Sequence, residues 1–241
     1  MNIQKLKEWI KTSENIVFFG GAGVSTESGI PDFRGEEGIF KTVSEYGVRP
    51  ETILSHSFFI KNTEVFFEYY KKHLLYPDAK PNAAHYALAK LERQGILKAV
   101  ITQNIDDLHQ KAGSKNVLEL HGTLYRNYCI KCGVVYDLEY VKNSKGITKC
   151  EKCSGIVRPD VVLYEESLDE EVMGKAIRYI SEADVLIVGG TSLNVYPAAG
   201  LINYYRGKKL VLINKSVTSF DDRANLCIHM NIGDVFEKIM E

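Results

Sequence analysis

The sequence predicts an α/β protein built on a parallel, doubly wound sheet that two insertions interrupt. Short, continuously apolar runs recur along the chain with helical segments between them, as expected for strands buried on both faces. Two stretches break this alternation, one rich in aromatic residues and one that holds clustered cysteines. Hydrophobic residues make up 45% of the 241 residues, which is enough for a complete core.

The alternation defines the elements in order. The expected strands are Ile16–Phe19, Ala99–Thr102, Val117–Leu120, Val185–Gly189, Leu210–Asn214 and Cys227–Met230. The expected helices are Ile3–Lys11, Ser57–His73, Ala83–Gln94, Asp106–Ala112, Asp169–Ser181, Pro197–Arg206 and Val235–Met240. Because helices connect successive strands, the strands should pair in parallel.

The two irregular stretches predict two insertions. Residues 35–80 contain no central strand, which predicts a helical excursion, and residues 122–158 hold four of the five cysteines, which predicts a small module. The large domain then consists of residues 1–34, 81–121 and 159–241.

The charge balance excludes some classes of partner. With 30 Lys+Arg against 31 Asp+Glu, nothing favours direct binding to nucleic acid or to a membrane surface. No apolar run approaches the ~20 residues of a membrane span. Residues 1–11 have the pattern of an amphipathic helix and not of a signal peptide. The expected compartment is the cytoplasm, and the oligomeric state is not predicted.

Two Cys-x-x-Cys pairs, Cys129 with Cys132 and Cys150 with Cys153, predict a metal site. Their spacing is typical of a tetrahedral zinc site of four thiolates. The segment between them is too short for its own core, so the metal would hold it together. Four protein ligands leave no open position, which favours a structural ion; the alternative is four unrelated structural cysteines. Cys227 is expected to be a core residue.

A glycine-rich turn follows the first expected strand, in the order Gly21, Ala22, Gly23, Val24, Ser25 and Thr26. Glycines followed by free N–H groups at a helix start can hold a phosphate. Only the first two glycines of the dinucleotide-binding fingerprint are present. The fingerprint also requires a second strand that ends in a ribose-binding acidic residue ~20 residues after the glycines, and the chain has no such strand there. A rigid turn, an acid, an aromatic ring and a cation come next, at Pro31, Asp32, Phe33 and Arg34. The loop is therefore expected to do more than hold phosphates.

Polar residues also end later strands, at the sheet edge where ligands bind. They are Gln103 to His109, Glu119 to Gly122, Gly189 to Ser192, and Asn214. His121 is best placed for general-base work, because an unperturbed imidazole has a pKa of ~6.5. Asp106 has the alternative role of a helix cap, and His109 is expected to satisfy a local hydrogen bond. Taken alone, Asn214 is best explained as part of a polar turn.

In order, these motifs resemble those of one family. They are Gly21 to Ser25, Gly29 to Arg34, Gln103 to Asp106, Leu120 to Gly122, the two cysteine pairs and Gly190 to Ser192. From about Asn15 to Asp234 the chain is similar to the sirtuins, which are NAD-dependent protein deacylases. The resemblance implies a Rossmann-like large domain and a zinc module, with NAD and acyl-lysine meeting in the cleft between them.

The resemblance also implies roles for individual residues. His121 would be the general base, and Asn104 and Asp106 would order the ribose and the nicotinamide. Phe33 would shield the reacting sugar carbon. The NAD contacts would be Gly21, Ala22, Gly23, Ser25, Thr26, Asp32, Phe33, Arg34, Gln103, Asn104, Ile105, Asp106, Gly190, Thr191, Ser192 and Asn214.

The residue types suit cleavage of NAD. The acyl oxygen of the substrate would attack the sugar carbon in a pocket that excludes water, and His121 would then activate a ribose hydroxyl. The products would be lysine, nicotinamide and O-acetyl-ADP-ribose. A mono-ADP-ribosyltransferase using the same pocket is the main alternative. A zinc-bearing module that binds modified peptides without chemistry is another, and the missing ribose acid weakens the case for a dehydrogenase.

The implied partner is an acetyl-lysine protein or peptide, held by main-chain pairing. Segments 159–166 and 192–196 match the family's substrate-binding edges, and Val161, Val162, Leu193 and Val195 would contact the substrate. Glu165 stands where many relatives have glycine. Together with Glu166 it could favour basic peptides, although a solvated edge is the preferred interpretation.

The expected acyl group is neutral. Relatives that remove acidic acyl groups carry Tyr-x-x-Arg at positions that match Phe67 and Tyr70 here. Without that arginine no cation is available to pair with an acyl carboxylate, so a neutral group such as acetyl is favoured.

Overall fold

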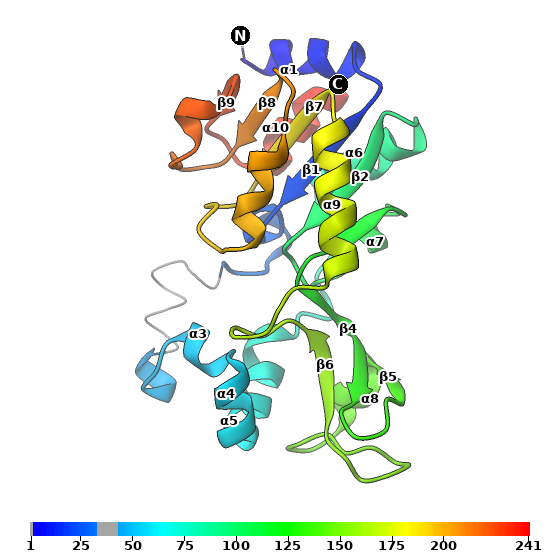
Figure 1. Cartoon of the computed structure of the whole chain (residues 1–241), viewed down its shortest axis with the longest axis vertical. Coiled ribbons are helices and arrows are strands. Elements are labelled where there is room, and N and C mark those ends of the chain that lie inside the picture. The colour runs from blue at the N-terminus through cyan, green and yellow to red at the C-terminus, as the bar shows by residue number, and fades with distance from the viewer. Residues whose placement is uncertain (1, 33–42) are drawn as a thin grey trace.

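A six-stranded parallel sheet forms the centre of the computed structural model, which describes residues 2–32 and 43–241 (Figure 1). Its strands lie in the order β3-β2-β1-β7-β8-β9, and all of their pairings are parallel. They are β1 Ile16–Gly20, β2 Leu97–Thr102, β3 Val117–Glu119, β7 Val185–Gly189, β8 Leu210–Ile213 and β9 Leu226–Ile228. This confirms the predicted fold class and all six predicted strands.

Both faces of the sheet are buried, which explains why its strands are continuously apolar. Ile16 and Phe18 of β1 point into a cluster formed with three helices, α1 Asn2–Lys11, α6 Ala83–Arg93 and α10 Ile232–Met240. Val17 and Phe19 point to the other face, against α9 Glu170–Glu182 and the 3₁₀ helix Ala198–Tyr204. The large domain therefore has three layers, and the terminal helices α1 and α10 pack against each other on one face of its sheet (Figure 1).

The strand order reverses between β1 and β7. From β1 the chain moves outward through β2 and β3, and β7 then returns to the other side of β1. Gly20 and Gly189 pair with each other at the carboxyl ends of these two strands. Ligands bind in the crevice that such a reversal opens at the carboxyl edge of a sheet.

The first insertion is helical, as predicted, but its long helix is broken. It contains α3 Pro50–Ile53, α4 His56–Lys61, α5 Thr63–Tyr69 and a π-helical turn Tyr70–Leu74. The single helix predicted from Ser57 to His73 was wrong, because Asn62 between α4 and α5 has φ −131° and ψ 47°. Asparagine readily leaves the helical region, since its side chain competes for backbone hydrogen bonds.

The second insertion is an antiparallel sheet of three strands, β4 Gly122–Cys129, β5 Val135–Asp137 and β6 Val157–Val161, with α8 Leu138–Asn143. Its buried residues share one apolar cluster with the aromatic residues of the first insertion, so that Phe66 and Tyr70 pack with Leu124 and Val157. The two insertions therefore form one unit, seen below the large sheet in Figure 1.

Two other helices differ from their predictions. The helix expected at Asp106–Ala112 is the single turn α7 Leu108–Lys111, because Asp107 before it has a left-handed φ of 64°. The segment expected as a helix at Pro197–Arg206 forms a 3₁₀ helix from Ala198 to Tyr204. Across residues 2–32 and 43–241, no helix is long and apolar enough to cross a membrane.

Candidate active site

A cavity of about 270 Å³ lies where the carboxyl edge of the large sheet meets the two insertions. Its lining includes most of the predicted NAD and catalytic residues: Gly21, Ala22, Ser25, Asp32, Gln103, Asn104, Ile105, Asp106, His121, Gly190, Thr191 and Ser192. A second cavity of about 430 Å³ contains the predicted residues Gly23, Thr26 and Asn214. Asp32, Gly190 and Ser192 line both cavities, which therefore adjoin.

The glycine-rich turn crosses the sheet reversal in direct backbone contact with the loop after β7. The amides of Gly21 and Gly23 donate to the carbonyls of Gly189 and Gly190, at 3.1 and 2.8 Å. A Cβ on Gly21 would lie 2.7 Å from Cβ of Thr191, and one on Gly23 would lie 2.8 Å from Cα of Gly190. These glycines are thus needed for close approach of the two loops.

Ser25 links the two candidate residues Asn104 and Asp106. Its hydroxyl donates to Oδ2 of Asp106 at 2.6 Å and accepts a hydrogen bond from the Asn104 side-chain amide at 3.1 Å. The other oxygen of Asp106 accepts from the amide of Leu108 at 3.0 Å, so the helix-capping role of Asp106 is also present. A serine that donates and accepts at once holds both polar side chains in one orientation.

The pKa of Asp106 is raised. Burial raises it, while the hydrogen bonds from Ser25 and the Leu108 amide act in the opposite direction. Burial disfavours the charged form of a carboxyl group, and hydrogen bonds to the carboxylate favour it.

His121 has a defined tautomer. Its Nδ1 lies 2.9 Å from the carbonyl oxygen of Gln103. Because a carbonyl only accepts hydrogen bonds, Nδ1 carries the hydrogen, and the neutral ring has its basic lone pair on Nε2. Imidazoles that act as general bases are commonly oriented in this way.

The strand ends are joined to each other as well. The side-chain amide of Gln103 donates to Oγ1 of Thr191 at 3.0 Å, which connects the ends of β2 and β7. The carbonyl of Ile105 accepts a hydrogen bond from the amide of Leu124 at 3.0 Å, so this segment is also held by β4. The cavity wall is thus tied together across both domains.

Some predicted residues have other placements. Phe33 and Arg34 lie outside the described residues. Asn214 lines the second cavity, where its side-chain amide donates to the carbonyl of Ser216 at 3.2 Å. Its position at a sheet edge is confirmed, and it also forms part of a polar turn.

The prediction for His109 was wrong. Its imidazole is buried, and neither ring nitrogen has a hydrogen-bond partner among the described residues. It faces His85, with the ring centroids 4.7 Å apart. Burial lowers the pKa of both imidazoles, to about 4 for His85. Sequence reasoning missed this pair, because its two members lie on different helices.

The predicted substrate residues are divided between the cavity and the core. Val161, Val162 and Val195 line the cavity. The side chain of Leu193 is buried in the cluster beneath the sheet, at 2% exposure. At Leu193 only the backbone is available for contact with a substrate.

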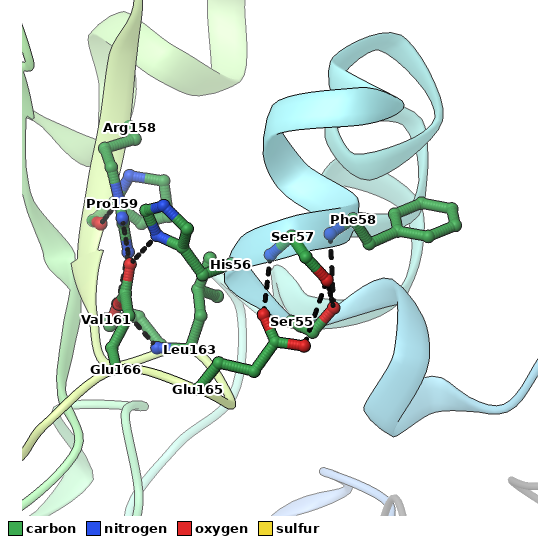
Figure 2. A network of polar contacts seen from close by, with 10 residues as sticks. All are labelled: Ser55, His56, Ser57, Phe58, Arg158, Pro159, Val161, Leu163, Glu165 and Glu166. Atoms are coloured by element: carbon green, nitrogen blue, oxygen red, sulfur yellow. Dashed lines mark hydrogen bonds and ion pairs between the residues drawn. The ribbon is translucent and has the colours of Figure 1, made fainter.

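Glu166, in the predicted substrate segment of residues 159–166, has several hydrogen-bond partners (Figure 2). Arg158 donates to its two oxygens at 2.6 and 3.0 Å, His56 contacts it at 2.8 Å, and the amide of Leu163 donates at 2.8 Å. Burial raises the pKa of Glu166, but these hydrogen bonds outweigh it and lower the pKa to about 2. Sequence reasoning noticed the carboxylate but gave no role to His56 or Arg158, because no local pattern marks them.

The four clustered cysteines could hold a metal ion. Their sulfur atoms all lie within 4.8 Å of one another, and the closest pairs are 3.5 and 3.6 Å apart. These distances are far beyond the ~2.05 Å of a disulfide and close to the ~3.8 Å between sulfurs around a tetrahedral zinc ion. A Cβ on Gly155 would lie 2.9 Å from Sγ of Cys129, so the chain leaves room beside the cluster. The residues present therefore fit a four-thiolate site.

Comparisons with known proteins agree with this geometry. The model of the Sir2 family matches residues 21–197. An NAD-dependent protein deacetylase of Clostridium perfringens is 62% identical over 240 residues, covering 99% of this chain and 98% of that protein. A solved Sir2 structure with p53 peptide and NAD⁺ has a TM-score of 0.88 at 39% identity, over 100% of this chain and 98% of that one. Another, a Sir2 variant with deacetylated p53 peptide and 3'-O-acetyl-ADP-ribose, has a TM-score of 0.90 at 40% identity, over 100% and 98%.

Proposed function

The chain belongs to the Sir2 family and is an NAD-dependent protein deacetylase, and we propose that it moves the acetyl group from lysine to ADP-ribose in the cavity beside His121. The reaction would consume NAD, the acetylated lysine and one water, and would release nicotinamide, the free lysine and O-acetyl-ADP-ribose. One observation carries the assignment of the site: the hydrogen bond from Nδ1 of His121 to the Gln103 carbonyl leaves the basic nitrogen on a ring that lines the cavity.

We propose that the two cavities divide NAD between them. The adenosine half would lie in the second cavity with Thr26 and Asn214, and the pyrophosphate would lie over the glycine-rich turn. The nicotinamide end would lie beside the Ser25, Asn104 and Asp106 network in the first cavity. NAD supplies the reactive sugar carbon and the ribose hydroxyls.

In this arrangement the protein would bind and orient NAD and the substrate, and it would move one proton. Asn104 and Asp106 would orient the ribose and the nicotinamide, and Nε2 of His121 would accept the proton of a ribose hydroxyl. This hydroxyl would then attack the former amide carbon of the substrate. Positioning of this kind lowers the entropic part of the barrier, and a correctly placed base contributes further.

We propose that the cysteine site holds zinc with a structural role. Cys129, Cys132, Cys150 and Cys153 would supply four thiolates, and a filled tetrahedral shell leaves no position for a substrate. The metal would stabilise the sheet of β4, β5 and β6. Paired cysteines with metal-ligand spacing are typical of proteins in a reducing compartment, so we place the protein in the cytoplasm.

We infer that the acyl group is neutral. The described residues that line the first cavity include five carboxylates, of Asp32, Glu51, Asp106, Glu165 and Glu166, but no lysine or arginine. Phe67 and Tyr70 are fully buried, and neither offers a cation. A negatively charged acyl group would meet repulsion here without a partner.

The variant His121→Ala tests the proposal. The variant should still bind NAD but should lose at least about 100-fold in kcat for acetyl-lysine peptide, as expected for the loss of a general base. Mass spectrometry measures the release of nicotinamide and of acetyl-ADP-ribose from acetylated peptide, for the variant and for the wild-type protein.

His73→Ala is the matched control, because His73 lies in the helical insertion beside Glu45 and lines neither cavity. It should keep wild-type turnover. Full activity of His121→Ala would remove His121 from the role of base. ADP-ribose attached to protein, in place of acetyl-ADP-ribose, would favour the transferase alternative.

A further inference from the structure

Two segments that contribute residues to the lining of the first cavity have backbone groups without partners among the residues that the structure describes. The N–H and C=O groups of Glu165 form no hydrogen bond with any described residue, and the same holds for Ser192 and Asn194. Glu165 and Ser192 both line the cavity. Unpaired backbone groups of this kind are the surface to which an extended peptide adds as a strand.

The residues before Glu165 are held in place by backbone hydrogen bonds to other parts of the chain. The amide of Val162 donates to the carbonyl of His121 at 3.0 Å, and Arg158 donates to the carbonyl of Val161 at 2.7 Å. Tyr164 pairs with the first insertion, donating to the carbonyl of Leu54 and accepting from the amide of His56, each at 2.9 Å. The N–H and C=O groups of Glu165 are therefore unpaired in a loop whose neighbouring groups at Val161, Val162 and Tyr164 hold it in place.

Glu165 has an unfavourable backbone conformation for a residue with a side chain. Its φ is +76°, in the left-handed region that glycine adopts freely. Its carboxylate accepts hydrogen bonds from the amide and the hydroxyl of Ser57, at 2.8 and 3.0 Å (Figure 2). Ser57 is in the first turn of α4, where backbone amides lack helical partners and a carboxylate is favoured.

We propose that Glu165 is a positioning residue for the substrate peptide. Its side chain anchors the loop to α4 and so holds its own N–H and C=O groups where the peptide strand pairs. A glycine at this position would adopt the same φ without strain but would leave the loop unanchored. The inference rests on the proposed function, because it requires the peptide to bind between residues 159–166 and 192–196.

Electrostatic recognition of basic peptides is the competing role for Glu165. The carboxylate of Glu166 is paired with Arg158, whereas that of Glu165 is exposed and has only neutral partners. A charge effect would depend on the sequence of the peptide and would be screened by salt. An anchoring effect would weaken all peptides alike and would survive replacement by glutamine, whose amide oxygen also accepts from Ser57.

The experiment compares Glu165→Gly with Glu165→Gln. We measure KM and kcat for two acetyl-lysine peptides, one flanked by arginines and one by alanines, and the Kd of each labelled peptide by fluorescence anisotropy. Glu165→Gly should raise KM and Kd about tenfold for both peptides, with kcat and the KM for NAD unchanged. Glu165→Gln should stay within twofold of wild type. Glu171→Gln, a surface carboxylate of α9, is the charge control.

Each other outcome overturns the inference in a distinct way. Unchanged affinity of Glu165→Gly would exclude the anchor. Equal loss in both variants would show that the hydrogen bonds to Ser57 are not what matters, and loss only for the arginine-flanked peptide would assign Glu165 to charge recognition. If wild-type protein releases no nicotinamide with either peptide, the proposed function itself fails. The glycine variant adopts the same positive φ without strain, and far-UV circular dichroism checks that it is folded.

Discussion

Ser25 shows how one hydroxyl organises the site. It lies in the glycine-rich turn, yet its partners Asn104 and Asp106 lie 79 and 81 residues further along the chain. Both of its hydrogen-bonding functions are in use, so Asn104 and Asp106 keep fixed orientations in the cavity. Motifs that are separate in the sequence therefore form one hydrogen-bonded network in space.

The buried imidazole of His85 predicts a loss of stability in acid. Burial lowers its folded-state pKa to about 4, below the ~6.5 of an unfolded chain. The neutral ring makes its full contribution to the free energy of unfolding above pH ~6.5. Below that pH the unfolded chain takes up a proton on this histidine while the folded protein does not, so the contribution is lost as the pH falls toward 4. At pH 5 this linkage removes about 2 kcal/mol from the free energy of unfolding. Urea unfolding from pH 8 to pH 5 measures it.

The variant His85→Gln isolates this effect. The backbone amide of Asn82 donates a hydrogen bond to Nδ1 of His85 at 3.2 Å. The side-chain oxygen of a glutamine can accept this hydrogen bond, but a glutamine does not titrate. Its free energy of unfolding should therefore fall less than that of wild type over the same pH range. Parallel pH profiles would contradict the argument. His56→Gln, at an exposed position, is the control.

At the scale of elements, Gly122 controls how the second insertion leaves the large domain. It directly follows His121 and begins β4, and its φ is +73°. A Cβ there would lie only 1.9 Å from the carbonyl oxygen of Asp160 in β6. Backbone atoms cannot move aside cheaply, so the start of β4 against β6 requires glycine.

Gly122→Ala should destabilise the protein far more than Gly133→Ala. Gly133 has nearly the same φ, +72°, but a Cβ there would contact nothing within 4 Å. Its substitution should cost only the left-handed strain of about 1 kcal/mol. Gly122→Ala adds the backbone clash and should lower Tm by several degrees more. Thermal unfolding measures both variants, and equal Tm values would contradict the assigned clash.

Sequence patterns predicted the regular elements better than their interruptions. The six strands are short apolar runs buried on both faces, and periodicity is sufficient to locate such runs. The helix break at Asn62 and the left-handed conformation of Asp107 depend on the backbone angles of single residues. The periodicity of hydrophobic residues along the sequence carries no information about such angles. The helices around the site were therefore predicted too long.

At the scale of the whole molecule, the two insertions depend on each other. They share one apolar cluster, and Lys71 of the first insertion donates to the carbonyls of Ser144 and Gly146 in the second, each at 2.8 Å. The second insertion also carries the cysteine site. Loss of a metal there should therefore loosen the entire lower unit and with it the loop of residues 159–166.

Removal of zinc should destabilise the insertions before the large sheet. Mass spectrometry of metals should find one zinc per wild-type chain and none in Cys132→Ser. Hydrogen exchange should speed up in β4, β6 and α5 of that variant while β1 and β7 stay protected. Cys227→Ser is the matched control, because Cys227 lies in β9 of the large sheet. A wild-type chain without zinc, or uniform exchange across both units, would contradict the proposed role.

The sequence by itself determined the strand alternation, the glycine-rich turn, the metal-ligand spacing and the polar residues at the strand ends. These are local patterns, set by periodicity and by the conformational needs of single residues. Only the tertiary structure decided which distant side chains meet. Glu165 reaches Ser57 across 108 residues, His85 faces His109, and Leu193 lies in the core with only its backbone left for a substrate. Such contacts depend on how the elements pack, and packing is a property of the whole chain.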